Sequence, residues 1–154
     1  MSNRRHIIYK RILVPVDGSD TSGQGLSEAL HLAGDQNAEL QILHINDLGF
    51  THRNYEGLVN LAELERSAHE AAEKVLNDAK ALATANGIDA ELKLLETETG
   101  EVAKVIVEEA IRWHADLIVM GTHGRRGLKH MLLGSEAEGV VRMAPVPVLL
   151  VRGS

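Results

Sequence analysis

The sequence predicts an α/β fold in which one open sheet of parallel strands is covered by helices on both faces. Short runs rich in Val, Ile and Leu alternate along the chain with longer segments of helical periodicity. The apolar runs are nearly continuous, which is typical of parallel strands that are buried on both faces. Strands that alternate with helices form such sheets through right-handed crossovers. A length of 154 residues without a repeat predicts one domain over residues 1–154.

Five segments are predicted to be strands. Four of them are continuous apolar runs, namely Arg11–Val16, Glu39–Ile45, Asp116–Gly121 and Val146–Val151. The fifth, Ala90–Glu96, alternates in part between apolar and polar residues and is a weaker pattern. The five segments predict a sheet of five strands, because each is separated from the next by a segment long enough for a crossover.

The first predicted helix covers Thr21–Asp35 and follows the first strand. Thr21 and Ser22 are candidate N-caps, because their hydroxyl groups can accept a hydrogen bond from a first-turn N–H group. One face of this helix is apolar and is predicted to face the sheet; it carries Leu26, Ala29, Leu30 and Ala33.

The longest predicted helix covers Val59–Ala85, and the pair Asn86-Gly87 is typical of a helix C-cap. Apolar residues recur along it every three or four positions, which predicts an amphipathic helix. The predicted inward stripe consists of Leu61, Leu64, Ala68, Ala71, Val75, Ala79 and Leu82.

Two further helices are predicted in the second half of the chain. One covers Gly100–Ala115, and the other begins near Ser135 and ends by Ala144, because Pro145 follows. The inward residues of the first are predicted to be Val102, Val105, Ile106, Ala110 and Trp113. The segment Asn46–Leu58 has no clear pattern and is predicted to be a long connection.

The composition excludes several classes of protein. The net charge is -6 and only 3% of the residues are aromatic, which argues against a nucleic-acid-binding surface. No cysteine is present, which excludes disulfides and zinc–cysteine sites. No apolar run approaches the ~20 residues that a membrane span needs. We therefore expect a cytoplasmic protein without a membrane span.

The segment after the fourth predicted strand is rich in glycine and suits a bound anion. Gly121 and Gly124 follow the strand directly, so the backbone can approach a ligand closely. Gly134 and Ser135 follow after nine intervening residues at the start of the last helix, whose free N–H groups favour an anion. Positive charge between them comes from Arg125, Arg126, Lys129 and His130. Phosphate is the natural ligand of this arrangement, and a structural turn with a capped helix is the alternative.

Asp17 ends the first predicted strand, which would bring it to the same edge of the sheet. An open α/β sheet binds ligands at the carboxyl ends of its strands, where the strand order reverses. The carboxylate of Asp17 suits a ribose hydroxyl or an amino group of a base. Capping of a turn in "DGSDTS" is the equally good alternative.

The stretch "GTHGRRGLKHMLLGS" resembles the Gly-x-x-Gly-x9-Gly-Ser/Thr pattern of the universal stress proteins. The opening "KRILVPVDGSDTS" and the closing "APVPVLLVR" are similar to the flanking parts of that family, so the resemblance covers essentially the whole chain. It implies a Rossmann-like five-stranded sheet of order 3-2-1-4-5 that binds an adenine nucleotide. It also implies a homodimer formed through the last strand, here Val146–Val151.

The resemblance also implies a set of nucleotide-contacting residues. On the adenine and ribose side these are Pro15, Val16, Asp17 and Ile45. Nearer the ribose and phosphates they are Met120, Gly121 and Gly124, with Arg125 among the cations that follow. The phosphates themselves would be held by Gly134, Ser135 and the backbone N–H of Glu136.

One departure from the family pattern concerns the phosphates. ATP-binding members usually have a small uncharged residue after the Gly-Ser pair, whereas this chain has Glu136 and then Glu138. A carboxylate there suits the helix dipole but repels a phosphate, unless a magnesium ion or an arginine lies between them. The expected ligand is therefore ATP, with Mg²⁺ as a bridging ion, or AMP, which this charge affects less.

Three functions follow from these patterns. The first is a regulatory module that binds an adenine nucleotide and acts on an unknown protein partner. The second is a nucleotide-free stress-response dimer that acts through protein contacts, and the third is a slow ATPase. No nucleophile motif, general base or histidine pair with metal-ligand spacing is present, so neither catalytic residues nor a metal site are predicted.

Overall fold

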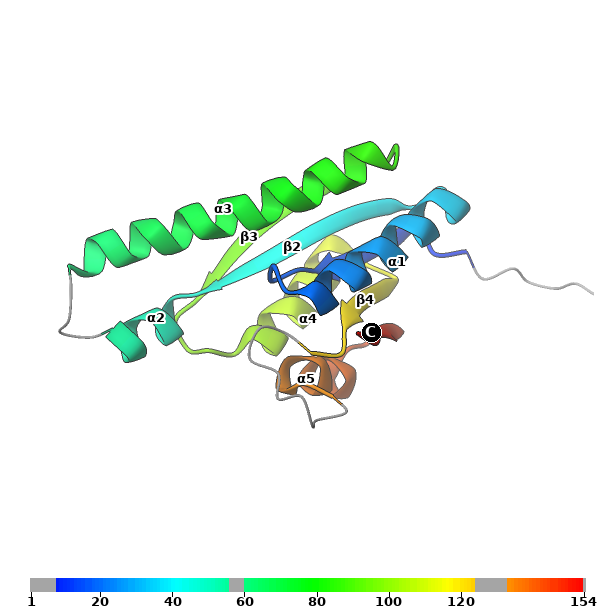
Figure 1. Cartoon of the computed structure of the whole chain (residues 1–154). Helices are drawn as coiled ribbons and strands as arrows, with labels where there is room; N and C mark the ends of the chain where they lie inside the picture. Colours follow the sequence, from blue (N-terminus) through cyan, green and yellow to red (C-terminus); the bar gives the residue numbers. More distant parts are fainter. Residues whose placement is uncertain (1–7, 56–59, 124–132, 154) are drawn as a thin grey trace, which may run out of the picture.

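Five parallel strands form one sheet in the order β3-β2-β1-β4-β5, which confirms the order that the resemblance implied (Figure 1). The computed structural model describes residues 8–55, 60–123 and 133–153. The strands are β1 (Arg11–Pro15), β2 (Glu39–Asp47), β3 (Glu91–Thr97), β4 (Leu117–Gly121) and β5 (Val148–Val151). The helices are α1 (Asp20–Gln36), α2 (Leu48–Tyr55), α3 (Leu61–Ala85), α4 (Val102–Trp113) and α5 (Ser135–Met143).

Helices on the two faces of the sheet create two cores. Ile12 and Ile42 pack with α1 and α3 on one face, whereas Leu13 and Leu43 pack with α4 and α5 on the other. Consecutive residues of a strand serve opposite cores because side chains alternate along it. All four side chains are fully buried. The sheet is therefore covered on both faces, as its continuous apolar strands predicted.

The predicted connection Asn46–Leu58 is wrong in part, because α2 lies within it. Asp47 begins this helix: its Oδ1 accepts a hydrogen bond from the N–H of Phe50 at 2.9 Å. Aspartate is a preferred N-cap residue, because its carboxylate accepts a hydrogen bond from a backbone N–H of the first helical turn. This helix has only 8 residues, which is too short for a helical periodicity to be recognised in the sequence.

The N-cap of α1 is Ser19 and not Thr21 or Ser22, which both lie inside the helix. The Ser19 hydroxyl accepts from the N–H of Ser22 at 3.2 Å. Asp20 then becomes the first helical residue, and its charge suits the helix dipole. The predicted inward residues of this helix are buried.

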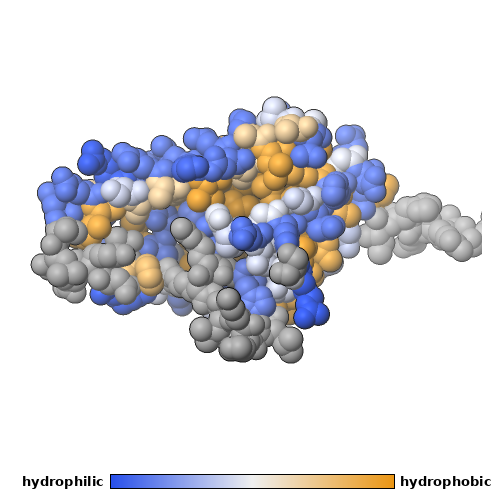
Figure 2. Space-filling model, in the orientation of Figure 1, coloured by the Kyte–Doolittle hydropathy of each residue, from blue (hydrophilic) through white to orange (hydrophobic). Residues whose placement is uncertain are grey.

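The predicted inward stripe of α3 is wrong by about one position over part of its length. Leu61 and Leu82 are 47% and 40% exposed, whereas the buried residues are Ala72, Leu76, Ala79 and Ala83. Alanine occupies both possible faces of this helix, so periodicity alone does not select one. Hydrophilic side chains cover much of the outer surface of α3, apolar residues reach the surface near its C-terminal end, and apolar side chains lie between α3 and α1 (Figure 2).

Several strand boundaries differ from prediction by one or two residues. The strand β1 ends at Pro15, β2 extends to Asp47, β3 covers Glu91–Thr97, β4 begins at Leu117 and β5 begins at Val148. The predicted helix end at Asn86-Gly87 is confirmed, with Gly87 at φ 73°. Within the described ranges, no helix is long and apolar enough to cross a membrane.

Candidate functional site

The strand order reverses at β1, whose neighbours β2 and β4 lie on opposite sides. Because all strands are parallel, their carboxyl ends share one edge, here called the carboxyl edge; the opposite one is the amino edge. Ligands of open α/β sheets bind at the carboxyl edge beside such a reversal. Nine of the eleven predicted site residues are described, while Gly124 and Arg125 lie outside the described residues.

The turn after β1 is fixed by hydrogen bonds around Asp17. Its backbone N–H donates to the hydroxyl of Ser22 at 3.2 Å, and its Oδ1 accepts from the N–H of Ser19 at 2.9 Å. The Ser22 hydroxyl donates in turn to the carbonyl oxygen of Ser19 at 3.2 Å. Gly18 completes the turn at φ 83°, a conformation that favours glycine. The turn therefore holds Asp17, half-buried, at the carboxyl edge.

The end of β4 lies directly against the first turn of α1. A Cβ atom on Gly121 would stand 2.8 Å from both the carbonyl oxygen and Cγ2 of Thr21. A Cβ atom on Gly25 would stand 3.0 Å from the backbone nitrogen of Gly121. Glycine at both positions lets the helix approach the strand this closely, which brings the turn after β1 beside the end of β4.

Thr122 joins the start of α5 to the end of β4. Its carbonyl oxygen accepts from the N–H of Gly134 at 2.6 Å, and its own N–H donates to the carbonyl oxygen of Val151 at 3.0 Å. Its side chain is buried, and its hydroxyl contacts Nδ1 of His123 at 3.0 Å. These bonds place the N-terminus of α5 at the carboxyl edge, beside β4.

The first turn of α5 has the features of an anion-binding helix terminus. Gly134 is the N-cap and provides no side-chain capping bond. Ser135 is exposed and Glu136 is half-buried, so both lie at the surface of this edge. The positive end of the helix dipole coincides here with backbone N–H groups that the helix itself does not use.

The side chains on the edge come from one face of the sheet. Ile45 and Met120 belong to the core that α4 and α5 cover, with Ile45 half-buried and Met120 at 5% exposure. The side chain of Val16 packs into the opposite core, with α1 and α3. Only its backbone reaches the edge: the N–H donates to Leu43 and the carbonyl oxygen contacts Nδ1 of His44 at 2.7 Å.

The universal stress protein family model matches residues 8–152, which spans both parts of this site. The chain belongs to the universal stress protein family. The universal stress protein MJ0531 of Methanocaldococcus jannaschii is 38% identical over 148 residues, which cover 94% of this chain and 83% of that protein.

Solved structures of the family agree with the fold. A universal stress family protein from Burkholderia pseudomallei is 34% identical with a TM-score of 0.75, covering 93% of this chain and 96% of that one. A universal stress protein solved in complex with cAMP is 27% identical with a TM-score of 0.69, covering 96% and 100%.

In this universal stress protein, the packing of α2 beside the carboxyl edge was not predicted from the sequence. The first turn of α2 packs on the turn between β3 and α4, where a Cβ atom on Gly49 would collide with the carbonyl oxygen of Glu98. Arg53 reaches across this contact: its Nη2 would lie 3.4 Å from a Cβ atom on Gly100. These contacts come from segments far apart in sequence, so no local pattern predicts them.

Ser22 and Thr122 were also missed as site residues of the stress protein. Ser22 was predicted only as a cap, although its hydroxyl binds the backbone of Asp17. Thr122 lies between the two glycines of the Gly-x-x-Gly motif, at a position that the motif leaves unspecified. Thr122 joins α5 to β5 through backbone hydrogen bonds to Gly134 and Val151, and a motif of residue types does not predict backbone bonds.

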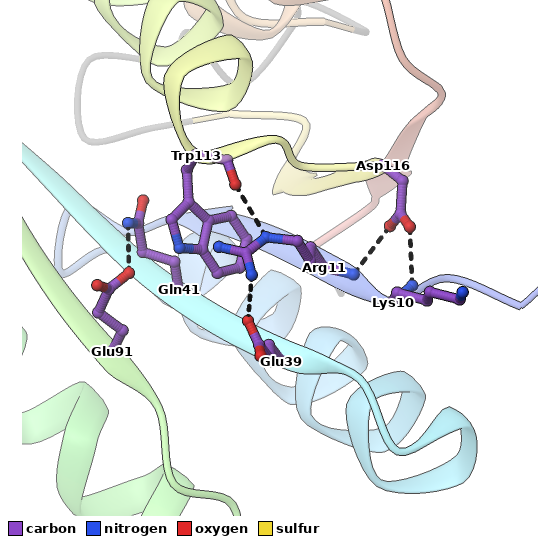
Figure 3. Close-up of polar contacts among 7 residues, drawn as sticks. All are labelled: Lys10, Arg11, Glu39, Gln41, Glu91, Trp113 and Asp116. Atoms are coloured by element: carbon purple, nitrogen blue, oxygen red, sulfur yellow. Dashed lines mark hydrogen bonds and ion pairs between the residues drawn. The ribbon is translucent and has the colours of Figure 1, made fainter.

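The amino edge is closed by a polar cluster (Figure 3). Asp116 accepts hydrogen bonds from the backbone N–H groups of Lys10 at 2.8 Å and Arg11 at 3.0 Å. Nε of Arg11 donates to the carbonyl oxygen of Trp113 at 2.9 Å, and its guanidinium lies 4.2 Å from the centre of the indole ring. Arg11 also forms an ion pair with Glu39. The cluster therefore ties β1, β2 and the end of α4 together.

Two cavities in the described part of the chain lie away from the carboxyl edge. One of about 300 Å³ adjoins the polar cluster and is lined by Arg11, Glu39 and Trp113, among others. The other, of about 370 Å³, lies between α3 and β3. The first is at the wrong end of the sheet for a strand-reversal site, and its Arg11 is already bound within the protein.

An ion pair within α4 joins a buried carboxylate to an exposed arginine. Glu109 is 3% exposed, and its carboxylate accepts from Nε and Nη2 of Arg112, each at 2.6 Å. Burial raises the pKa of Glu109, but hydrogen bonds from Arg112 and Gln41 and the charges of Arg112 and Lys93 together hold that pKa below its usual value. Glu109 therefore places a carboxylate on the inward face of α4, where periodicity had not predicted it.

The described residues do not bring together three histidine, aspartate or glutamate side chains that could hold a metal ion. His44 is half-buried, and its bond to the carbonyl oxygen of Val16 fixes it against the end of β1.

Proposed function

We propose that this universal stress protein is a regulatory module that binds an adenine nucleotide, ATP or AMP, at the carboxyl edge. The observation that carries the proposal is the convergence at one point of the turn after β1, the end of β4 and the N-terminus of α5. The Gly134–Thr122 bond and the close contact of Gly121 with Thr21 bring these segments together. A related stress protein has been solved with cAMP, which supports an adenine nucleotide as the ligand class.

The proposed contacts divide between base and phosphate. Ile45 and Met120 would offer apolar surface to the adenine, since both face the core beneath this edge. Asp17 would accept a hydrogen bond from a ribose hydroxyl, because the bonds of Ser19 and Ser22 hold its turn in place. The N–H groups at the start of α5 would bind phosphate. A cytoplasmic location and an unidentified protein partner remain parts of this proposal.

Titration calorimetry with AMP and ATP tests the proposal. Asp17→Asn should weaken nucleotide binding about tenfold or more, because one hydrogen bond to a charged group is lost. Asp20→Asn is the matched control: it removes the same charge from an exposed residue of the same segment and should change the Kd less than about twofold. Absence of binding to the unaltered protein at millimolar nucleotide would reject the proposal and favour a nucleotide-free dimer.

We also propose that two copies of the chain pair through β5. This strand ends the sheet, and its outer edge leaves backbone groups for a further strand. Leu149 on β5 is 38% exposed, and Val141 and Met143 on α5 are also exposed. These apolar side chains adjoin the open edge, so a second copy could cover them.

Leu149→Asp should convert a dimer into a monomer, because pairing would bury the new carboxylate. Leu82→Asp is the matched control, since Leu82 is 40% exposed on α3, which packs near the other end of the sheet. Sedimentation velocity at micromolar concentration measures the oligomeric state of both variants and of the unaltered protein. A monomeric unaltered protein, or a dimer that survives Leu149→Asp, would contradict pairing through β5.

A further inference from the structure

The strand β3 ends the described sheet on the side opposite β5, and its one neighbouring strand there is β2. It is 7 residues long and pairs with β2 from Glu91 to Thr97. Alternate residues of a strand direct their N–H and C=O groups to opposite sides, so β3 points backbone donors and acceptors away from β2. This outer edge of β3 can therefore pair with a further extended strand.

A cavity of about 370 Å³ lies beside the outer edge of β3, between this strand and α3. Its apolar lining consists of Leu76, Leu92 and Leu94, and its polar lining of Glu73 and Asn77. Leu92 and Leu94 are half-buried and point to the α3 face of the sheet. A strand added to β3 would direct every second side chain to the same face. An apolar side chain at that position would cover the two leucines.

The charges along β3 are mostly negative. Four exposed carboxylates belong to the strand and the residues beside it, namely Asp89, Glu91, Glu96 and Glu98. Lys93 is the one cation in residues 89–98, and it is half-buried. The charges of Lys93 and Arg112 both lower the pKa of Glu109, so these cations already act on a buried carboxylate. The outer edge of β3 therefore favours a basic partner.

The cavity of about 300 Å³ at the amino edge adjoins the start of the same strand, where Asp89 and Glu91 line it. Glu91 accepts a hydrogen bond from Nε2 of the buried Gln41 at 2.7 Å, which holds its carboxylate in place without neutralising it. Arg11, the cation in this lining, is paired with Glu39. Glu91 lies next to Leu92 in the strand, so its side chain points to the opposite, α4 face.

We propose that the outer edge of β3 binds an extended segment of a partner protein in which apolar and basic residues alternate. An apolar side chain would enter the cavity beside α3, over Leu92 and Leu94. The next side chains would lie on the α4 face, where a lysine or arginine meets Glu91 and Asp89. A second copy of this chain fits less well, because β3 paired with itself would bring like charges together.

This inference gives a chemistry to the protein partner of the proposed function but does not rest on nucleotide binding. The strand order places β3 two strands away from β1 and three from β4, whose ends form the nucleotide site proposed above. Binding at the two places is therefore measured separately.

Fluorescence anisotropy of a labelled peptide of about eight residues, with alternating lysine and valine and blocked ends, tests the proposal without nucleotide. The peptide should bind the unaltered protein with a Kd of about 10–100 µM, and higher salt should weaken binding. A peptide with its lysines in one block and its valines in another keeps the composition but loses the alternation. It should bind at least about fivefold more weakly, as should a peptide with glutamate in place of lysine.

Asn77→Phe tests the cavity from an exposed position, because the new ring would occupy the space beside Leu92 and Leu94. It should weaken binding of the alternating peptide about 5- to 10-fold. Ala81→Phe is the matched control: it adds the same side chain to an exposed position one turn later that does not line the cavity. It should change the Kd less than about twofold.

Three results would overturn the proposal. The first is equal affinity for the alternating and block peptides, and the second is an unchanged Kd in Asn77→Phe. The third is an oligomer of the unaltered protein that survives Leu149→Asp and that Asn77→Phe dissociates, because a second copy would then cover β3. Nucleotide titrations of Asn77→Phe should give the Kd of the unaltered protein, so failure of this inference leaves the proposed function standing.

Discussion

Replacing Gly121 by alanine is expected to lower the free energy of unfolding by about 1–3 kcal/mol and to weaken the proposed nucleotide binding. The new Cβ atom would stand 2.8 Å from backbone and side-chain atoms of Thr21, so β4 and α1 must separate. That movement displaces the end of β4, which carries the Thr122 bridge to α5. Urea denaturation measures the first effect, and calorimetric titration with AMP measures the second.

Gly23→Ala is the control for this change. Gly23 lies in α1 like Thr21, and a Cβ atom there would meet no atom within 4 Å. Alanine should therefore stabilise the helix by about 0.5–1 kcal/mol and leave nucleotide binding unaltered. A Gly121→Ala protein as stable as the unaltered one would show that the close approach of α1 to β4 is not required.

Replacing Trp113 by alanine is expected to lower the free energy of unfolding by about 3–5 kcal/mol. Trp113 is 7% exposed in the core beneath α4 and α5, and the guanidinium of Arg11 stacks on its ring. The substitution opens a cavity and removes the surface on which Arg11 stacks. Urea denaturation of the two proteins measures the difference in the free energy of unfolding.

Ile111→Ala is the control for this change. It distinguishes the loss of a buried side chain from a general effect of truncating a side chain on α4. Ile111 is 56% exposed on the same helix, so its truncation should cost less than about 0.5 kcal/mol. Because Trp113 lies at the amino edge, the folded Trp113→Ala protein should keep the nucleotide Kd of the unaltered chain. Similar losses of stability in the two variants would contradict the role assigned to Trp113.

The fold was largely predictable because the strands are continuous apolar runs separated by helical segments. The order of the strands came from the family resemblance and not from the runs themselves. Periodicity was insufficient for α3, where alanines at positions 71 and 72 allow two registers and packing selects Ala72. It also missed α2, for which the capping carboxylate of Asp47 was the available signal.

The location of candidate residues at the carboxyl edge was predictable where it depends on a motif or a strand end, as for Asp17, Gly121 and Gly134, whereas their contacts with a nucleotide stay a prediction. It was not predictable where it depends on contacts between distant segments. Val16 shows the difference: its place at a strand end is correct, but alternation along the strand turns its side chain into the opposite core. The hydrogen bonds of Thr122 appear only when β4, β5 and α5 are assembled.

The start of α5 is tied to the last two strands of the sheet. The N–H of Gly134 donates to the carbonyl oxygen of Thr122, and the N–H of Thr122 donates to the carbonyl oxygen of Val151. Thr122 is thus the one residue between two backbone bonds, one to the helix and one to the end of β5. A ligand that displaced the start of α5 would therefore also displace the end of the outermost strand through the backbone of Thr122.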